Sequence, residues 1–140
     1  MIEISKKSTT HLHIDCSSEF EHLDRIVDET EAFLGGLITD PEFAYKIVLL
    51  VSEAATNAIE HGNALDVSKQ VKLDVKVIPS KVTITVEDEG EGFERTAVQN
   101  PTADENLLID GGRGLFFIEE MADDVSYELN GRRVNIVFNR

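Results

Sequence analysis

The sequence of 140 residues predicts an α+β fold. We expect a two-layer α/β sandwich, with one mostly antiparallel sheet of about five strands and three helices on a single face. Apolar and polar residues alternate at 71–77 and at 82–86, and Pro79-Ser80 between them predicts a hairpin. Two long stretches before this hairpin place apolar residues at helical spacing. Because only one face of the hairpin is apolar, the helices should cover that face. Residues 1–140 are expected to form one domain.

The first predicted elements are a strand and a helix. Apolar and polar residues alternate at 11–16, which indicates a strand. Ser17 and Ser18 then offer N-caps, and Glu21 stands at capping-box spacing from Ser18. The helix that follows should end at Gly35-Gly36.

A second helix is predicted from a start signal at Thr39-Asp40-Pro41-Glu42, because proline is tolerated in the first turn. It should end at His61-Gly62. Gly62 is expected in the left-handed conformation that closes many helices, and His61 suits the negative helix end. A structural role therefore explains His61 without catalysis.

The C-terminal part is predicted to contain a long loop, a short helix and a second hairpin. Residues 94–110 have no clear periodicity, and loops of this length are often lids or binding segments. A helix is expected from Gly114 to Met121 and a strand from Val125 to Leu129. Asn130-Gly131 is typical of a two-residue turn, after which alternation at 134–138 indicates the last strand.

The composition excludes several classes of partner. The formal net charge of −14 argues against binding to nucleic acid or to an anionic membrane, which both require basic surfaces. A nucleotide is still possible, because helix N-termini and a bound cation neutralise phosphates locally. Cys16 is the only cysteine, and no apolar stretch is long enough for a signal peptide or a transmembrane helix. We therefore expect a cytoplasmic protein.

Glu53 and Asn57 are four residues apart on the second predicted helix, so their side chains share a face. A carboxylate and an amide oxygen in this arrangement can serve a magnesium ion and a nucleophile beside it. The two residues taken alone are more typical of a solvated helix surface.

Asp88 follows the strand that ends the first hairpin, and Gly90 and Gly92 come directly after it. A carboxylate there can accept a hydrogen bond from an exocyclic amine, which distinguishes adenine from guanine. Glycine allows the backbone to turn tightly and to approach a flat ligand. An acidic turn without a ligand would have the same sequence.

A glycine-rich segment, Gly111-Gly112-Arg113-Gly114, precedes the third predicted helix. Free N–H groups at a helix start bind phosphate, and glycine removes the side chain that would obstruct it. Neither a Walker A loop nor the dinucleotide-binding glycine pattern is present. Arg113 can contact a phosphate or project toward a partner.

The three segments together resemble the N, G1 and G2 boxes of the GHKL ATPase superfamily. The stretches Val51-Ser-Glu-Ala-Ala-Thr-Asn-Ala-Ile-Glu-His61 and Gly111-Gly-Arg-Gly-Leu-Phe-Phe-Ile118, with Glu105-Asn106-Leu107 before the latter, are similar to bacterial anti-sigma factor serine kinases. The similarity extends over about residues 10–138.

This resemblance implies a Bergerat fold with ATP and Mg²⁺ as cofactors, and a lid at about 94–110. It makes Glu53 the catalytic base, Asn57 the magnesium ligand and Asp88 the residue that reads adenine. The full ATP-binding set that it implies is Asn57, Asp88, Gly90, Gly92, Gly111, Gly112, Arg113, Gly114 and Leu115. One departure is Arg132-Arg133, near the position where many relatives have a threonine that assists at the adenine.

The resemblance predicts a serine/threonine protein kinase that is also an anti-sigma factor. Its expected partners are an anti-anti-sigma protein of the STAS type, which it phosphorylates on serine, and a sigma factor, which it sequesters; a homodimer is also implied. One alternative is a regulator that binds nucleotide and protein without catalysis. Another is a detached catalytic domain of a histidine kinase, although no helix with a phosphoacceptor histidine precedes the domain.

Overall fold

The computed structural model describes residues 1–90 and 118–140, which form one antiparallel sheet of six strands in the order β1-β2-β3-β4-β6-β5. The strands are β1 (Ile2–Ser8), β2 (His11–Ser17), β3 (Gln70–Ile78), β4 (Lys81–Glu87), β5 (Asp124–Glu128) and β6 (Arg133–Asn139). Strand β6 lies between β4 and β5. This arrangement puts the start of β6 beside the end of β4.

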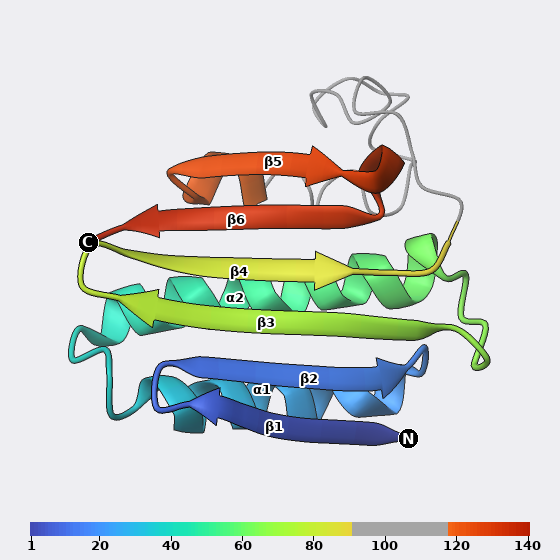
Figure 1. The fold of residues 1–140 in the computed structure, drawn as a ribbon, viewed down its shortest axis with the longest axis horizontal. Helices are drawn as coiled ribbons and strands as arrows, with labels where there is room; N and C mark the ends of the chain where they lie inside the picture. Colours follow the sequence, from blue (N-terminus) through green and yellow to red (C-terminus); the bar gives the residue numbers. More distant parts are fainter. Residues whose placement is uncertain (91–117) are drawn as a thin grey trace.

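The helices lie on one face of the sheet (Figure 1). Helix α1 (Leu23–Leu34) follows a short 3-10 turn, η1 (Phe20–His22), and α2 (Pro41–Asn57) continues into the π-helical turn η2 (Ala58–Gly62). Residues 118–121 are also helical. The Asp40 side chain caps α2 by accepting a hydrogen bond from the Glu42 amide at 3.0 Å, as the start signal predicts.

The core forms between this helical layer and the sheet. Alternate residues of β2, β3, β4 and β6 are buried, while the residues between them are more exposed. Phe43 of α2 packs edge-to-face on Phe138 of β6, with ring centroids 5.8 Å apart. The largest fully buried side chains are Phe138, Leu12, Ile14, Ile26, Leu34, Ile47, Leu50, Ile59, Leu73, Ile84, Ile118 and Ile136. The predicted α+β class is confirmed.

The sheet has one strand more than the sequence predicts. Strand β1 pairs with β2 at the sheet edge, with Ile4 opposite Ile14. Only Ile2 and Ile4 of this strand are partly buried against the core, and its second half is exposed and polar. A short edge strand of this kind gives little periodic signal, because its second half carries no buried apolar residues.

Two predicted local structures are wrong. Ser18 makes no capping box, because its hydroxyl donates to the Lys69 carbonyl and accepts from the Asn63 side chain, each at 2.8 Å. The second predicted hairpin has a longer turn than Asn130-Gly131 suggests. Glu128 pairs with Arg133, so the chain reverses over residues 129–132 as the 3-10 turn η4 (Leu129–Gly131).

The helix-free face of the sheet carries polar side chains. His11 and His13 both bond Oδ1 of Asp74, at 2.7 and 2.8 Å, and His13 also bonds Asp15 at 2.9 Å. These two histidines therefore have structural partners within the sheet. The predicted lid at 94–110 lies outside the described residues, as does the start of the predicted helix 114–121. Within the described parts of the chain, no helix is long and apolar enough to cross a membrane.

Candidate nucleotide-binding site

Helix α2 and strand β4 run in the same direction, so that the helix end and the strand end lie on the same side of the molecule (Figure 1). Glu53 and Asn57 are on the last turns of α2, and both are half-buried. They flank the buried residues Ala54 and Ala58. Both side chains therefore lie at the border of the helix face that packs on the sheet, where the residue spacing places them.

The helix widens directly after Asn57. The π-helical turn η2 extends to Gly62, and the Asn63 amide donates to the Ala58 carbonyl at 2.8 Å. Single π-helical turns are rare, and they often occur at functional sites. Gly62 is not left-handed, contrary to the prediction; the positive φ angles follow later, at Ala64 (51°) and Leu65 (59°).

Asp88 follows β4 and has only 8% of its surface exposed. It continues the alternation of Val86 and Ile84, so its side chain lies on the helix-covered face. Its amide donates to the Arg132 carbonyl at 2.9 Å, and its Oδ1 accepts from the Gly90 amide at 2.8 Å. Its other oxygen, Oδ2, accepts no hydrogen bond from residues 1–90 or 118–140. Asp88 therefore retains an oxygen with which to accept a donor from a ligand.

Burial raises the pKa of Asp88 above its ordinary value. The Gly90 amide and the charge of Arg132 act in the opposite direction and lower it, but burial is the larger effect. Carboxylates with perturbed pKa values occur frequently at functional sites. Asp88 is thus both geometrically and electrostatically distinct from an ordinary acidic turn residue.

Gly62 and Gly90 bring the helix end and the loop after β4 into contact. A Cβ atom on Gly62 would lie 2.2 Å from Asp88 Oδ2, and one on Gly90 would lie 1.8 Å from the Gly62 carbonyl oxygen. Neither position admits a side chain without movement. The sequence predicts Gly90 as a site residue but assigns Gly62 only to the helix end.

The two glycines should respond differently to substitution by alanine. In Gly62→Ala the new methyl group meets the Asp88 side chain, so a rotation of Asp88 relieves the clash. We expect nucleotide affinity to fall about tenfold or more, with a small change in stability. In Gly90→Ala the methyl group meets backbone, so we also expect a stability loss of about 1–3 kcal/mol.

Calorimetric titration with ATP and thermal unfolding would measure both effects. Gly36→Ala is the matched control, because a Cβ there would have no atom within 4 Å. Wild-type ATP affinity in Gly62→Ala would show that the position of Asp88 does not matter for binding.

Asn57 supplies a buried polar group at the end of α2. Its Nδ2 atom is buried and has no hydrogen-bond partner in the described part of the chain. An unpaired buried amide is costly, and rotation about its Cβ–Cγ bond would place the oxygen in the same position. Mg²⁺ binds few protein oxygens and keeps several waters and phosphate oxygens. The half-buried Asn57, one turn from the Glu53 carboxylate, therefore fits a magnesium site.

The remaining predicted site residues, Gly92, Gly111, Gly112, Arg113, Gly114 and Leu115, lie outside the described residues.

Arg132 and Arg133, where the sequence departs from many relatives, have separate positions. The Arg133 guanidinium pairs with Glu87 at 2.6 Å on the helix-free face. Arg132 contributes its carbonyl to the Asp88 amide, and its Nε donates to the Leu129 carbonyl at 3.1 Å. Only Arg132 therefore contacts the residue predicted to read adenine.

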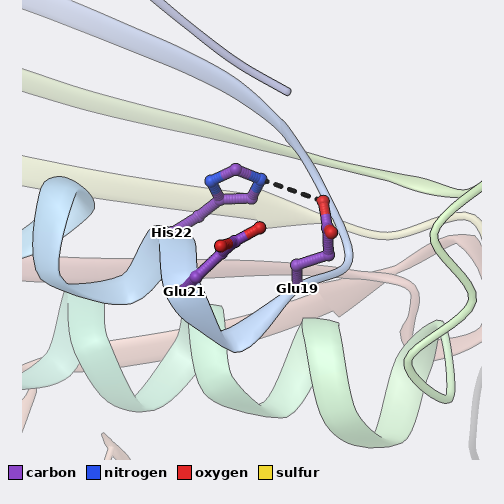
Figure 2. A group of neighbouring side chains, drawn as sticks. All are labelled: Glu19, Glu21 and His22. Carbon is purple, nitrogen blue, oxygen red and sulfur yellow. Dashed lines mark hydrogen bonds and ion pairs between the residues drawn. The ribbon is translucent and has the colours of Figure 1, made fainter.

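A second group of potential metal ligands, Glu19, Glu21 and His22, lies at the start of α1 (Figure 2). The His22 Nε2 atom lies 3.3 Å from the Glu19 carboxylate and 3.0 Å from the Ser17 hydroxyl. The His22 Nε2 atom therefore already has hydrogen-bond partners within the protein. We therefore interpret the group as a hydrogen-bonded connection between β2 and α1.

Asn63 is a site neighbour that the sequence analysis missed. It is fully buried, and its Oδ1 accepts a hydrogen bond from the Glu89 amide at 2.7 Å. The signal was present as an asparagine directly after His61-Gly62. A role for this asparagine could not be predicted from the sequence, because only the fold shows that it lies beside the loop after β4.

Comparison with known proteins shows the family of this chain. Residues 16–138 match the histidine kinase-like ATPase domain, so the chain belongs to that family, the GHKL type that the three motifs predict. Among curated proteins, it is similar to the serine-protein kinase RsbW of Staphylococcus aureus, with 26% identity over 147 residues, covering 94% of this chain and 87% of that protein. RsbW of Staphylococcus epidermidis is 25% identical over 145 residues, with 95% and 87% covered.

Proposed function

We propose that this protein is an ATP-dependent serine/threonine protein kinase and an anti-sigma factor. It transfers phosphate to a serine of an anti-anti-sigma protein of the STAS type, and it sequesters a sigma factor. The similarity to proteins named serine-protein kinase supports the reaction. The single observation that carries the proposal is Asp88, a buried carboxylate that lies against Gly62 and whose Oδ2 accepts no hydrogen bond from residues 1–90 or 118–140.

Each residue of the proposed site has a distinct role. Asp88 accepts the exocyclic amine of adenine, and Gly62 and Gly90 keep that carboxylate in place. Asn57 holds a magnesium ion, which neutralises phosphate charge when bound. Glu53 orients the substrate serine and takes its proton. Few protein groups suffice for phosphoryl transfer, because positioning and electrostatics supply most of the catalysis. Residues 111–115 are proposed to bind the phosphates.

The partners follow from the same proposal. The net charge of −14 suits proteins with basic surfaces, such as sigma factors, better than nucleic acid. We also propose a single domain that acts in the cytoplasm as a homodimer; light scattering would test the dimer. The histidine-kinase alternative is less well supported, because His11 and His13 lie in a strand and are hydrogen-bonded to Asp74.

The test is a phosphotransfer assay with labelled ATP and the anti-anti-sigma proteins of the native host, followed by phosphosite mapping. We expect label on one serine, and we expect EDTA to prevent it. Pull-down of sigma factors in ATP and in ADP would test sequestration. Tight ATP binding without transfer to any partner would favour the non-catalytic regulator instead.

A further inference from the structure

The Asn63 side chain connects three other parts of the chain, at Ser18, Gln70 and Glu89. Its Nδ2 donates to the Ser18 hydroxyl at 2.8 Å and to the Gln70 carbonyl at 3.0 Å, and its Oδ1 accepts from the Glu89 amide at 2.7 Å. The side chain has 0% of its surface exposed. Three hydrogen bonds therefore replace water at this buried amide. Loss of one partner would leave a buried polar group unsatisfied and would lower the stability of the protein.

These bonds close a ring with the loop after β4. Gln70, whose carbonyl accepts from Asn63, donates its own amide to the Glu89 carboxylate at 2.7 Å. Glu89 is thus held through both its backbone and its side chain. Its neighbours in sequence are Asp88 and Gly90. Glu89, which lies between these two residues, is therefore tied to the start of β3 and to Asn63, directly after η2.

We propose that Asn63 is a positioning residue that sets the preference for adenine through Asp88. This inference rests on the proposed function, since it assumes that Asp88 accepts the exocyclic amine of the base. Asn63 contacts Glu89 and not the nucleotide. The Glu89 amide that it binds belongs to the peptide that follows Asp88, and the Gly90 amide that holds Asp88 Oδ1 is one residue further along the same restrained loop. The Oδ2 atom, which accepts no hydrogen bond within the described residues, then has one direction in which to accept.

A site built to bind a substrate amine rejects an analogue that lacks it, because the buried acceptor is left unpaired. Guanine presents a carbonyl where adenine has the amine, so a fixed carboxylate opposes it. A loop released from Asn63 can turn the carboxylate away from guanine, which reduces the penalty.

The experiment compares ATP and GTP binding in wild type, Asn63→Ala and Ser18→Ala by calorimetric titration, with thermal unfolding of each. Asn63→Ala should weaken ATP binding about tenfold and bring the ATP-to-GTP affinity ratio toward one. Ser18→Ala is the matched control, because it removes two buried hydrogen bonds and leaves the bond from Glu89 to Asn63 intact. It should lower the unfolding temperature and leave the ratio unchanged.

Glu89→Ala provides a variant that is expected to fold, because Glu89 is exposed. It breaks the ring at Gln70 and should reduce the ATP-to-GTP ratio in the same direction by a smaller factor. An unchanged ratio in both Asn63→Ala and Glu89→Ala, or an equal change in Ser18→Ala, would overturn the inference alone. If wild type bound no ATP, the proposed function would fall as well.

Discussion

Glu53→Gln is expected to abolish phosphoryl transfer while ATP binding stays within a few-fold of wild type. Glutamine has nearly the same shape as glutamate but cannot take the proton of the substrate serine. Glu53 is on α2, one turn before the proposed magnesium ligand Asn57. The loss should be about 10²–10⁴-fold, the usual contribution of a general base.

Transfer to the cognate anti-anti-sigma protein and ATP titration would be measured on the same preparation. Glu42→Gln is the control, because it makes the same chemical change in the exposed first turn of α2. If Glu53→Gln phosphorylated its substrate at the wild-type rate, another residue would have to be the base. If Glu53→Gln lost ATP binding as well, Glu53 would be a binding residue, and its proposed role as the general base would be unsupported.

Asp88→Asn is expected to lose nucleotide binding and to gain stability. The Gly90 amide donates to one side-chain oxygen of Asp88, so an asparagine must point its NH₂ group where Oδ2 now lies. That group would meet the exocyclic amine of adenine, donor against donor. We expect ATP affinity to fall about a hundredfold, since a buried hydrogen bond to a charged group is replaced by an unpaired contact.

The gain in stability follows from the direction of the pKa shift. Burial raises the folded-state pKa of Asp88, so the folded protein binds a proton more readily than the unfolded chain. Ionisation of Asp88 therefore costs stability at any pH above its folded-state pKa. This cost disappears as the pH falls below the unfolded value. Asp88→Asn should raise the unfolding temperature near neutral pH, and its advantage should shrink as the solution is acidified.

ATP affinity of the wild type should also weaken on acidification, and it should do so at a higher pH than an ordinary aspartate would predict. Titrations and unfolding scans across the acidic range would measure both trends. Asp24→Asn, which removes an exposed carboxylate from α1, should show neither effect. A lower unfolding temperature for Asp88→Asn at neutral pH would contradict the raised pKa as the source of the cost.

Much of the fold was predictable because its signals are local. Alternation identified β2, β3, β4 and β6 within a residue or so, and the cap at Asp40 marked the start of α2. The edge strand β1 was missed because an edge with a polar second half does not alternate along its length. Ser18 was assigned to a helix cap, but a buried long-range hydrogen bond to Lys69 took its place.

The relative positions of candidate site residues were predictable only where the residues share one secondary-structure element. The spacing of Glu53 and Asn57 puts them on one helix face whatever the fold. Gly62 was instead interpreted as a left-handed helix end, because glycine is common there. Its actual requirement is the close approach of the Asp88 side chain, 26 positions later in the chain. No local pattern reports a contact of that kind.

The sequence by itself determined the alternating strands, the amphipathic helices, the acidic charge and the residue types of the three motifs. Tertiary structure alone decided that β6 lies between β4 and β5, that Gly62 and Gly90 touch, and that the Asn63 amide holds Glu89. The physical reason is the range of the forces involved. Periodicity and capping act within a few residues, whereas strand pairing and the satisfaction of buried amides join residues that only the folded chain brings together.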